Sequence, residues 1–236
     1  MPVNTASYNA LKNIAAQHNA VLVAVSKFKP IADIQLLYDL GQRDFGENFV
    51  QELLLKYEAL PKDIRWHYIG HLQSNKVKYI APFIYLIHGV DSEKLLAEIN
   101  KQAAKNNRVI DCLLQVHIAQ EETKFGFDDQ EIQELITRIF DTNYTNFKNV
   151  HISGLMGMAS FSEDKEKVRG EFKKLKMLFD KIKLQSPELY TSSHSFGEES
   201  GRGFLSMGMS GDYEIALEEG SNMIRIGSLL FGERKV

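Results

Sequence analysis

The chain has 236 residues, of which 44% are hydrophobic and 25% are charged, so it can fill a large core and wholesale disorder is excluded. A net charge of −3 argues against non-specific nucleic-acid binding, and a single cysteine, Cys112, excludes a disulfide framework and fits a reducing compartment. No apolar run approaches the roughly 20 residues of a membrane helix, and the N-terminus lacks a signal-peptide pattern, so we expect a cytoplasmic protein that binds neither membrane nor nucleic acid.

Short apolar runs alternate with helical patterns along the chain. The first run, residues 21–26 (VLVAVS), is nearly continuous and β-branched, which is typical of a buried parallel strand. The helical pattern at 31–41 follows it, and an amphipathic helix at about 6–18 precedes it. Further strands are predicted at 43–46, 65–70, 83–90, 109–118, 150–156, 204–207 and 223–226. The helices that follow them are predicted at 51–59, 75–81, 92–106, 130–140, 164–184, 212–219 and 229–231.

Eight strand–helix units predict a parallel sheet covered by helices. This number favours an α/β fold with a closed (β/α)₈ TIM barrel, formed by a single domain over residues 1–236. An open, doubly wound sheet is the alternative, because hydrophobic periodicity does not show whether a sheet closes.

Gly/Ser-rich segments follow the seventh and eighth predicted strands. TIM barrels carry their active sites at the C-terminal ends of the strands, and many bind a phosphate between these last two loops. Glycine permits close approach to the backbone and serine supplies a hydroxyl, so Ser210, Gly227 and Ser228 are candidate phosphate ligands. The same residues could instead turn the chain and cap helices.

Two basic residues stand near the same predicted pocket. Lys27 directly follows the first strand and could form a Schiff base with a carbonyl, whereas we expect Lys29 to lie in solvent. Arg225 interrupts the last strand, and a buried guanidinium needs a ligand or a partner such as Glu47. A phosphate next to a carbonyl that reacts with an amine suggests either a sugar phosphate or pyridoxal 5′-phosphate (PLP).

Six motifs in this order resemble the pyridoxal phosphate homeostasis (PLP-binding) protein family, which is related to the N-terminal barrel of alanine racemase. They are VAVSKFKP, FGEN, WHYIGHLQSNK, GLMGM, LSMGMSGD and MIRIGS. The resemblance implies that Lys27 holds PLP as a Schiff base and that Arg225 faces the pyridine nitrogen. It also implies that Ser210, Gly227 and Ser228 hold the phosphate.

Two further residues, Asn48 and His67, would line the pocket according to the resemblance. The chain departs from the family at Phe28 and at Ser228, where threonine is usual, and the replacement of threonine by serine keeps the hydroxyl. The polar segment 192–203 matches none of the motifs.

The resemblance implies a function in PLP homeostasis without catalytic turnover, with PLP-dependent apo-enzymes as partners. We expect a monomeric barrel, because no exposed apolar stripe in the sequence indicates a dimer. A guanidinium at the ring nitrogen disfavours the pyridinium form and weakens PLP as an electron sink. Racemisation also needs a second acid/base group, which alanine racemase takes from a second domain that we do not expect after the eighth strand. A PLP-dependent amino-acid racemase or lyase of low activity, a Schiff-base aldolase and an interaction protein are the alternatives.

Metal binding is not expected, because the histidines show no metal-ligand spacing. Cys112 lies within a predicted strand, where we expect a buried apolar thiol and not a nucleophile.

Overall fold

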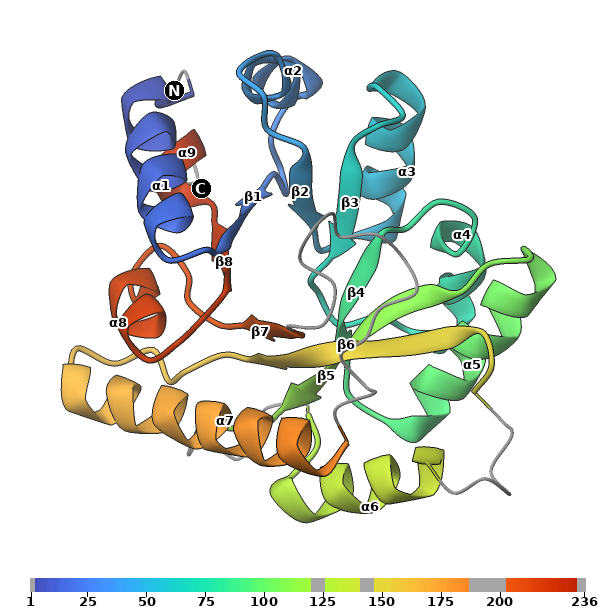
Figure 1. Cartoon of the computed structure of the whole chain (residues 1–236). Helices are drawn as coiled ribbons and strands as arrows, with labels where there is room; N and C mark the ends of the chain where they lie inside the picture. Colours follow the sequence, from blue (N-terminus) through green and yellow to red (C-terminus); the bar gives the residue numbers. More distant parts are fainter. Residues whose placement is uncertain (1–2, 120–125, 141–146, 187–202, 233–236) are drawn as a thin grey trace.

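The computed structural model describes residues 3–119, 126–140, 147–186 and 203–232. Eight parallel strands form one closed barrel in the order β1 to β8 (Figure 1). The barrel closes between its first and last strands, where Leu22 pairs with Ile224. The TIM-barrel prediction is therefore confirmed, and the open-sheet alternative is wrong.

The elements agree with the predicted strand–helix alternation. The strands are β1 (Val21–Val25), β2 (Asp44–Glu47), β3 (Arg65–Tyr68), β4 (Leu86–Val90), β5 (Ile110–Val116), β6 (Val150–Gly157), β7 (Phe204–Ser206) and β8 (Met223–Ile226). The helices are α1 (Thr5–Gln17), α2 (Ile31–Asp39), α3 (Val50–Ala59), η1 (Ser74–Lys76), α4 (Val77–Ile80), α5 (Glu93–Lys105), α6 (Asp129–Phe140), α7 (Lys165–Gln185), α8 (Tyr213–Glu218) and α9 (Ser228–Phe231).

The strand β4 begins three residues later than its apolar pattern predicts. Residues 83–85 were expected to open the fourth strand, but β4 begins at Leu86. The backbone N–H groups of Phe83 and Ile84 donate to the carbonyl of Ile80, at 3.1 and 2.9 Å, so they extend the turn after α4. Their apolar side chains suit a buried turn as well as a strand, which is why the pattern alone misplaced the boundary.

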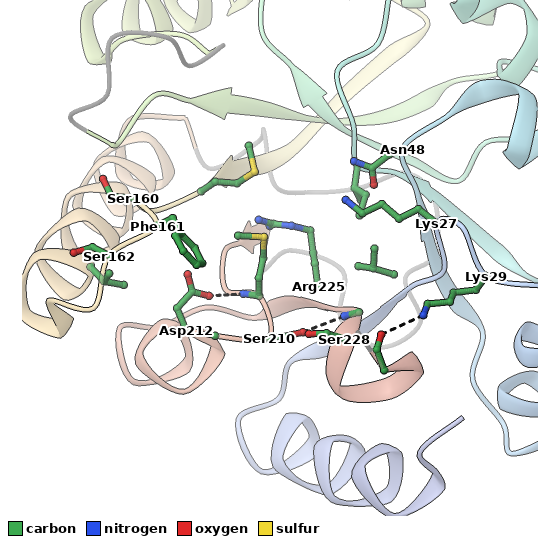
Figure 2. A pocket seen from close by; sticks show the side chains of 18 residues that line it. Lys27, Lys29, Asn48, Ser160, Phe161, Ser162, Ser210, Asp212, Arg225 and Ser228 are labelled. Carbon is green, nitrogen blue, oxygen red and sulfur yellow. Dashed lines mark hydrogen bonds between the residues drawn. The ribbon is translucent and has the colours of Figure 1, made fainter. Parts of the chain in front are cut away.

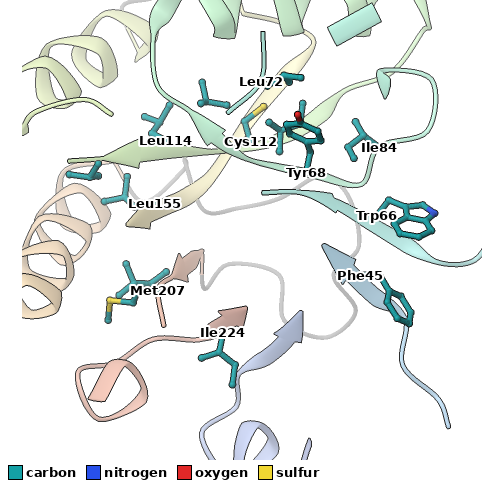
Figure 3. Close-up of a cluster of buried hydrophobic side chains, with 14 of the residues drawn as sticks. Phe45, Trp66, Tyr68, Leu72, Ile84, Cys112, Leu114, Leu155, Met207 and Ile224 are labelled. Carbon is teal, nitrogen blue, oxygen red and sulfur yellow. The ribbon is translucent and has the colours of Figure 1, made fainter. Parts of the chain in front are cut away.

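Side chains alternate across each strand and so build two cores. In β1, Leu22 and Ala24 belong to the core between sheet and helices, whereas Val23 belongs to a smaller cluster inside the barrel. Figure 3 shows part of the larger core, which includes Phe45 and Trp66, with ring centroids 6.0 Å apart. Burial of each such side chain contributes roughly 1.5–3 kcal/mol to folding.

The first and last helices pack together. The backbone N–H of Asn4 donates to the carbonyl of Leu230 at 2.8 Å, and Figure 1 shows α1 beside α9. The N-terminal helix therefore supports the segment that follows β8.

No helix within the described residues is long and apolar enough to cross a membrane. Most of the segment 192–203 lies outside the described residues.

Candidate functional site

A cavity of about 580 Å³ lies at the C-terminal ends of the barrel strands, a volume in the usual range for small-molecule sites. Residues at or just after the ends of β1, β2, β3, β6, β7 and β8 line it (Figure 2). Six residues named from the sequence are among them: Lys27, Asn48, Ser210, Arg225, Gly227 and Ser228. Figure 2 shows Arg225 between Lys27 on one side and Phe161 on the other.

Lys27 stands on a backbone segment that is anchored from both sides. Before it, the carbonyl of buried Ser26 accepts a hydrogen bond from Lys56 Nζ at 2.7 Å. After it, Phe28 has a φ of +61°, and its N–H donates to Glu52 Oε1 at 2.6 Å. A left-handed conformation costs a non-glycine residue roughly 1–2 kcal/mol. The hydrogen bond to Glu52 offsets this cost and holds the chain where Lys27 enters the cavity.

The anchors belong to a cluster under Lys27, formed by Ser26, Glu47, Glu52 and Lys56. Lys56 Nζ also donates to Glu47 Oε1 at 2.7 Å and to Glu52 Oε1 at 2.6 Å, and Ser26 Oγ donates to Glu47 Oε1 at 2.6 Å. Burial raises the pKa of Glu47, and the nearby ammonium opposes that rise. The partner of Glu47 is therefore Lys56, and the alternative of a core salt bridge between Glu47 and Arg225 is wrong.

Arg225 is almost fully buried and faces the cavity. Its Nη1 donates to Ser206 Oγ at 2.7 Å and its Nη2 to the carbonyl of Gly157 at 3.2 Å. Burial lowers the pKa of Arg225 to about 10, with Asp212 opposing the shift, so the guanidinium remains a cation at neutral pH. A held cation of this kind suits the polar edge of a ring or an anionic group.

The loops after β7 and β8 meet at one side of the cavity. Ser210 Oγ accepts a hydrogen bond from the N–H of Gly227 at 3.3 Å, which brings Ser210 next to Ser228 at the start of α9. Gly227 packs against Val25, because an added Cβ would lie in ordinary van der Waals contact, 3.5 Å from the Val25 Cβ. Hydroxyls beside accessible backbone can accommodate a phosphate group.

Gly208 explains how the chain reaches this position. Its φ is +97°, and an added Cβ would lie 2.6 Å from the Cβ of Ala216 in α8. Only glycine fits there, so the turn that carries Ser210 toward β8 depends on it.

Asn48 supplies a test of whether the cavity suits a polar ligand. Its Oδ1 is buried and accepts no hydrogen bond from the described residues. A buried acceptor without a partner costs about 1–3 kcal/mol, so a hydroxyl or ammonium group that donates to it would be favoured. Together with Lys27, Arg225 and the Ser/Gly loops, Asn48 fits a ligand that has an aldehyde, a phosphate and a hydroxyl, as PLP does.

Sequence reasoning missed two charged residues of the cavity. Lys29, expected in solvent, lies half-buried and donates to the carbonyls of Phe231 and Gly232 at 2.8 and 3.2 Å. Asp212 lines the cavity, and burial raises its pKa. The signal for Asp212 was its place two residues after Ser210, whereas nothing local indicated the distant carbonyls that hold Lys29.

His67 is placed elsewhere, since it does not line the cavity. Its side chain is fully buried inside the barrel, with Nε2 3.0 Å from Asp44 Oδ1 and Nδ1 2.9 Å from His88 Nε2. The strand pattern located His67 on β3 but could not show how far below the cavity it lies.

Two other expectations concern residues away from the cavity. Cys112 is a buried free thiol, and burial raises its pKa well above the ordinary value, which disfavours the nucleophilic thiolate. Among the described residues, no cluster of histidine, cysteine and carboxylate side chains could hold a metal ion.

Known proteins resemble the chain over nearly its whole length. The family described as alanine racemase, N-terminal domain, matches residues 5–235. A pyridoxal phosphate homeostasis protein of Aquifex aeolicus is 44% identical over 218 residues, covering 92% of this chain and 88% of that protein. One of Schizosaccharomyces pombe is 35% identical over 230 residues, covering 95% and 88%.

Solved structures show the same barrel. PipY of Synechococcus elongatus PCC7942 with PLP bound superposes with a TM-score of 0.79 at 31% identity, covering 96% of this chain and all of that one. Alanine racemase of Clostridium difficile, in complex with cycloserine, superposes with a TM-score of 0.73 at 14% identity, covering 98% of this chain and 59% of that one. The second likeness concerns the fold alone.

Proposed function

The chain belongs to the pyridoxal phosphate homeostasis protein family and has the barrel of the alanine racemase N-terminal domain, and on this premise we propose that it binds PLP. We infer that Lys27 holds PLP as a Schiff base and that the protein stores, delivers or buffers this cofactor without turning over a substrate. PLP-dependent apo-enzymes would be its partners, and it would act as a cytoplasmic monomer.

The observation that carries this proposal is the grouping of Lys27, Arg225 and the Ser210–Gly227–Ser228 loops around one cavity. Each supplies what one part of PLP needs: an amine for the aldehyde, a cation for the ring nitrogen, and two hydroxyls beside a glycine for the phosphate. Asn48 adds a buried acceptor, Oδ1, that has no donor among the described residues. The PLP-bound PipY structure, at 31% identity over nearly the whole chain, supports the same ligand.

The covalent step is a condensation that needs no further reactant. Lys27 would supply the amine nitrogen for a C=N bond to the aldehyde carbon of bound PLP, and the carbonyl oxygen would leave as water with the two hydrogens of the amine. The cluster under Lys27 holds the backbone on both sides of this residue, so the Cα from which the amine reaches into the cavity is fixed.

The cation at Arg225 argues against efficient turnover. PLP stabilises a carbanion best when its ring nitrogen is protonated, and a guanidinium that stays charged at neutral pH disfavours a second positive charge beside it. Weak racemase or lyase activity is the competing function, and it would require an acid/base group on the other side of the ligand.

The experiment that tests the proposal is reduction of the PLP-loaded protein with borohydride, followed by peptide mass spectrometry. Before reduction, we expect the PLP-loaded protein to be yellow and the Lys27→Ala variant to be colourless under the same conditions. After reduction, the wild-type protein should carry a pyridoxyl group on Lys27. Lys101→Ala, at an exposed helix position, is the matched control and should stay yellow. A protein that stays colourless with added PLP, or a label on another lysine, would overturn the proposal. Amino-acid turnover that Lys27→Ala abolishes would favour the competing function, a PLP-dependent racemase or lyase.

A further inference from the structure

A line of five polar side chains crosses the inside of the barrel, and we call it the interior hydrogen-bond chain: Asp44, His67, His88, Ser206 and Arg225. His67 Nε2 lies 3.0 Å from Asp44 Oδ1, and His67 Nδ1 lies 2.9 Å from His88 Nε2. His88 Nδ1 lies 3.0 Å from Ser206 Oγ, to which Arg225 Nη1 donates at 2.7 Å. The two histidines and the serine are fully buried.

The line connects the two ends of the barrel. Asp44 is the first residue of β2 and Arg225 the third of β8, and in parallel strands these positions lie toward opposite ends. At the first end, Arg65 Nε donates to Asp44 Oδ1 at 2.7 Å, and the Arg65 side chain is 45% exposed. At the other end, Arg225 lines the cavity. An anion near solvent is thus linked to the cation at the ligand site.

If the His67 ring is neutral, the donors and acceptors along the line agree with one direction only. Burial alone would raise the pKa of Asp44, but hydrogen bonds from Arg65 and His67 outweigh it and hold that pKa below its ordinary value, so Asp44 is a carboxylate and can only accept. A neutral His67 then carries its proton on Nε2, which leaves Nδ1 as an acceptor for His88 Nε2–H.

The second half of the line follows from the first. With its proton on Nε2, His88 offers Nδ1 as an acceptor to the Ser206 hydroxyl, and the Ser206 oxygen is free to accept from Arg225. Burial lowers the pKa of His88 well below its ordinary value, and the Arg225 guanidinium adds to this shift, which agrees with a neutral ring. Every member except the two ends accepts one hydrogen bond and donates one.

We propose that His67, His88 and Ser206 are positioning residues, which turn the Ser206 lone pair toward Arg225 and so fix the guanidinium in the orientation that it presents to the cavity. Asp44 sets the direction of the line from the far end of the barrel. Aligned hydrogen bonds polarise one another, so each link strengthens the next. The inference rests on the proposed function only in taking PLP as the ligand that Arg225 meets.

The first test uses the wild-type protein without any ligand. We expect ¹⁵N NMR of histidine-labelled protein at about pH 8 to show His67 and His88 with the ring proton on Nε2 and not on Nδ1. A proton on Nδ1 of either ring would overturn the inference. Because no PLP is present, this result is independent of the proposed function.

The second test separates the two links of His88 with a pair of variants. Asparagine places an amide near the position of Nδ1 and keeps the link to Ser206, whereas glutamine places it near Nε2 and keeps only the link to His67. We expect His88→Gln to raise the Kd for PLP about tenfold and to shift the absorbance spectrum of the bound cofactor, and His88→Asn to raise it less than about threefold. Leu113→Val, in the apolar cluster inside the barrel, is the matched control and should bind as the wild type does.

The outcomes distinguish a positioning role from a structural one. An equal rise in the Kd for PLP in His88→Gln and His88→Asn, or a similar rise in Leu113→Val, would overturn the inference. It would show that packing inside the barrel, and not the interior hydrogen-bond chain, determines PLP binding. If wild-type protein fails to bind PLP, the proposed function fails, and the NMR result alone decides the inference.

Discussion

Replacing Lys56 with methionine should destabilise the fold strongly, because this lysine neutralises a buried carboxylate under the ligand site. Lys56 and Glu47 have side chains that are 4% and 0% exposed, with Nζ and Oε1 2.7 Å apart. Methionine fills a similar volume but leaves Glu47 without its cation. Removing one partner of a buried ion pair costs about 3–5 kcal/mol, so we expect the free energy of unfolding to fall by that amount.

Lys176→Met is the matched control. Lys176 Nζ lies 2.5 Å from Asp180 on the surface of α7, but these side chains are 35% and 50% exposed. An exposed pair contributes about 0–1 kcal/mol, so this control should cost no more than that. The double variant Glu47→Gln/Lys56→Met should recover about 2 kcal/mol relative to Lys56→Met, because it removes the unpaired charge.

Urea denaturation at two pH values measures these differences. Burial already raises the pKa of Glu47, and loss of Lys56 should raise it further. A carboxyl group whose folded-state pKa is raised loses its stabilising contribution as pH rises through that pKa, so Lys56→Met should be less destabilised at about pH 5 than at about pH 8. An unchanged m-value would show that the unfolding transition is otherwise the same. The reasoning is refuted if Lys56→Met costs as little as Lys176→Met.

Three further predictions concern the phosphate loops, a glycine turn and the carboxylate at the far end of the barrel. Ser210→Ala and Ser228→Ala should each raise the Kd for PLP about tenfold more than the Kd for pyridoxal, because only PLP carries the phosphate. Fluorescence titration measures both constants, and equal losses of affinity for the two ligands would contradict the phosphate assignment. Gly208→Ala should lower the free energy of unfolding by at least about 2 kcal/mol, whereas Gly170→Ala, in an open position of α7, should raise it by about 0.5–1 kcal/mol. Equal effects of the two substitutions would contradict the conclusion that the positive φ of Gly208 requires glycine. Burial alone would raise the pKa of Asp44, but hydrogen bonds hold this pKa low. The ionised Asp44 carboxylate therefore stabilises the fold above the unfolded-state pKa, and this contribution is lost as pH falls through the folded-state pKa. Asp44→Asn should therefore flatten the acid side of the stability–pH curve, and an unchanged curve would contradict that role.

The sequence predicted the elements well where one local pattern determines them. Residues 223–226 were expected as a strand and are β8 without change, because three apolar residues and Arg225 form a short run between two turns. Closure of the barrel could not be predicted in this way, since Leu22 and Ile224 pair across nearly the whole chain and leave no local signature. The number of strands favoured closure, and only the structure decided it.

The site shows the same division between local and distant information. Lys27 was predicted because it directly follows a strand, where barrels place their ligands, and Arg225 because a charged residue interrupts an otherwise apolar strand. The position of His67 depended on Asp44 and His88, which lie on neighbouring strands, and the link onward to Ser206 spans 118 residues from His88. A periodic pattern reports which face a residue occupies, but not its height along the barrel axis.

The pairing of β1 with β8 also sets when the site can exist during synthesis. Lys27 leaves the ribosome about 200 residues before Ser228, which at roughly 5–20 residues per second is a delay of about 10–40 s. Throughout that interval the nascent chain has the amine and lacks both Arg225 and the phosphate loops. An aldehyde could react with the lysine, but nothing would retain it selectively, so cofactor loading belongs to the finished barrel and not to the emerging chain.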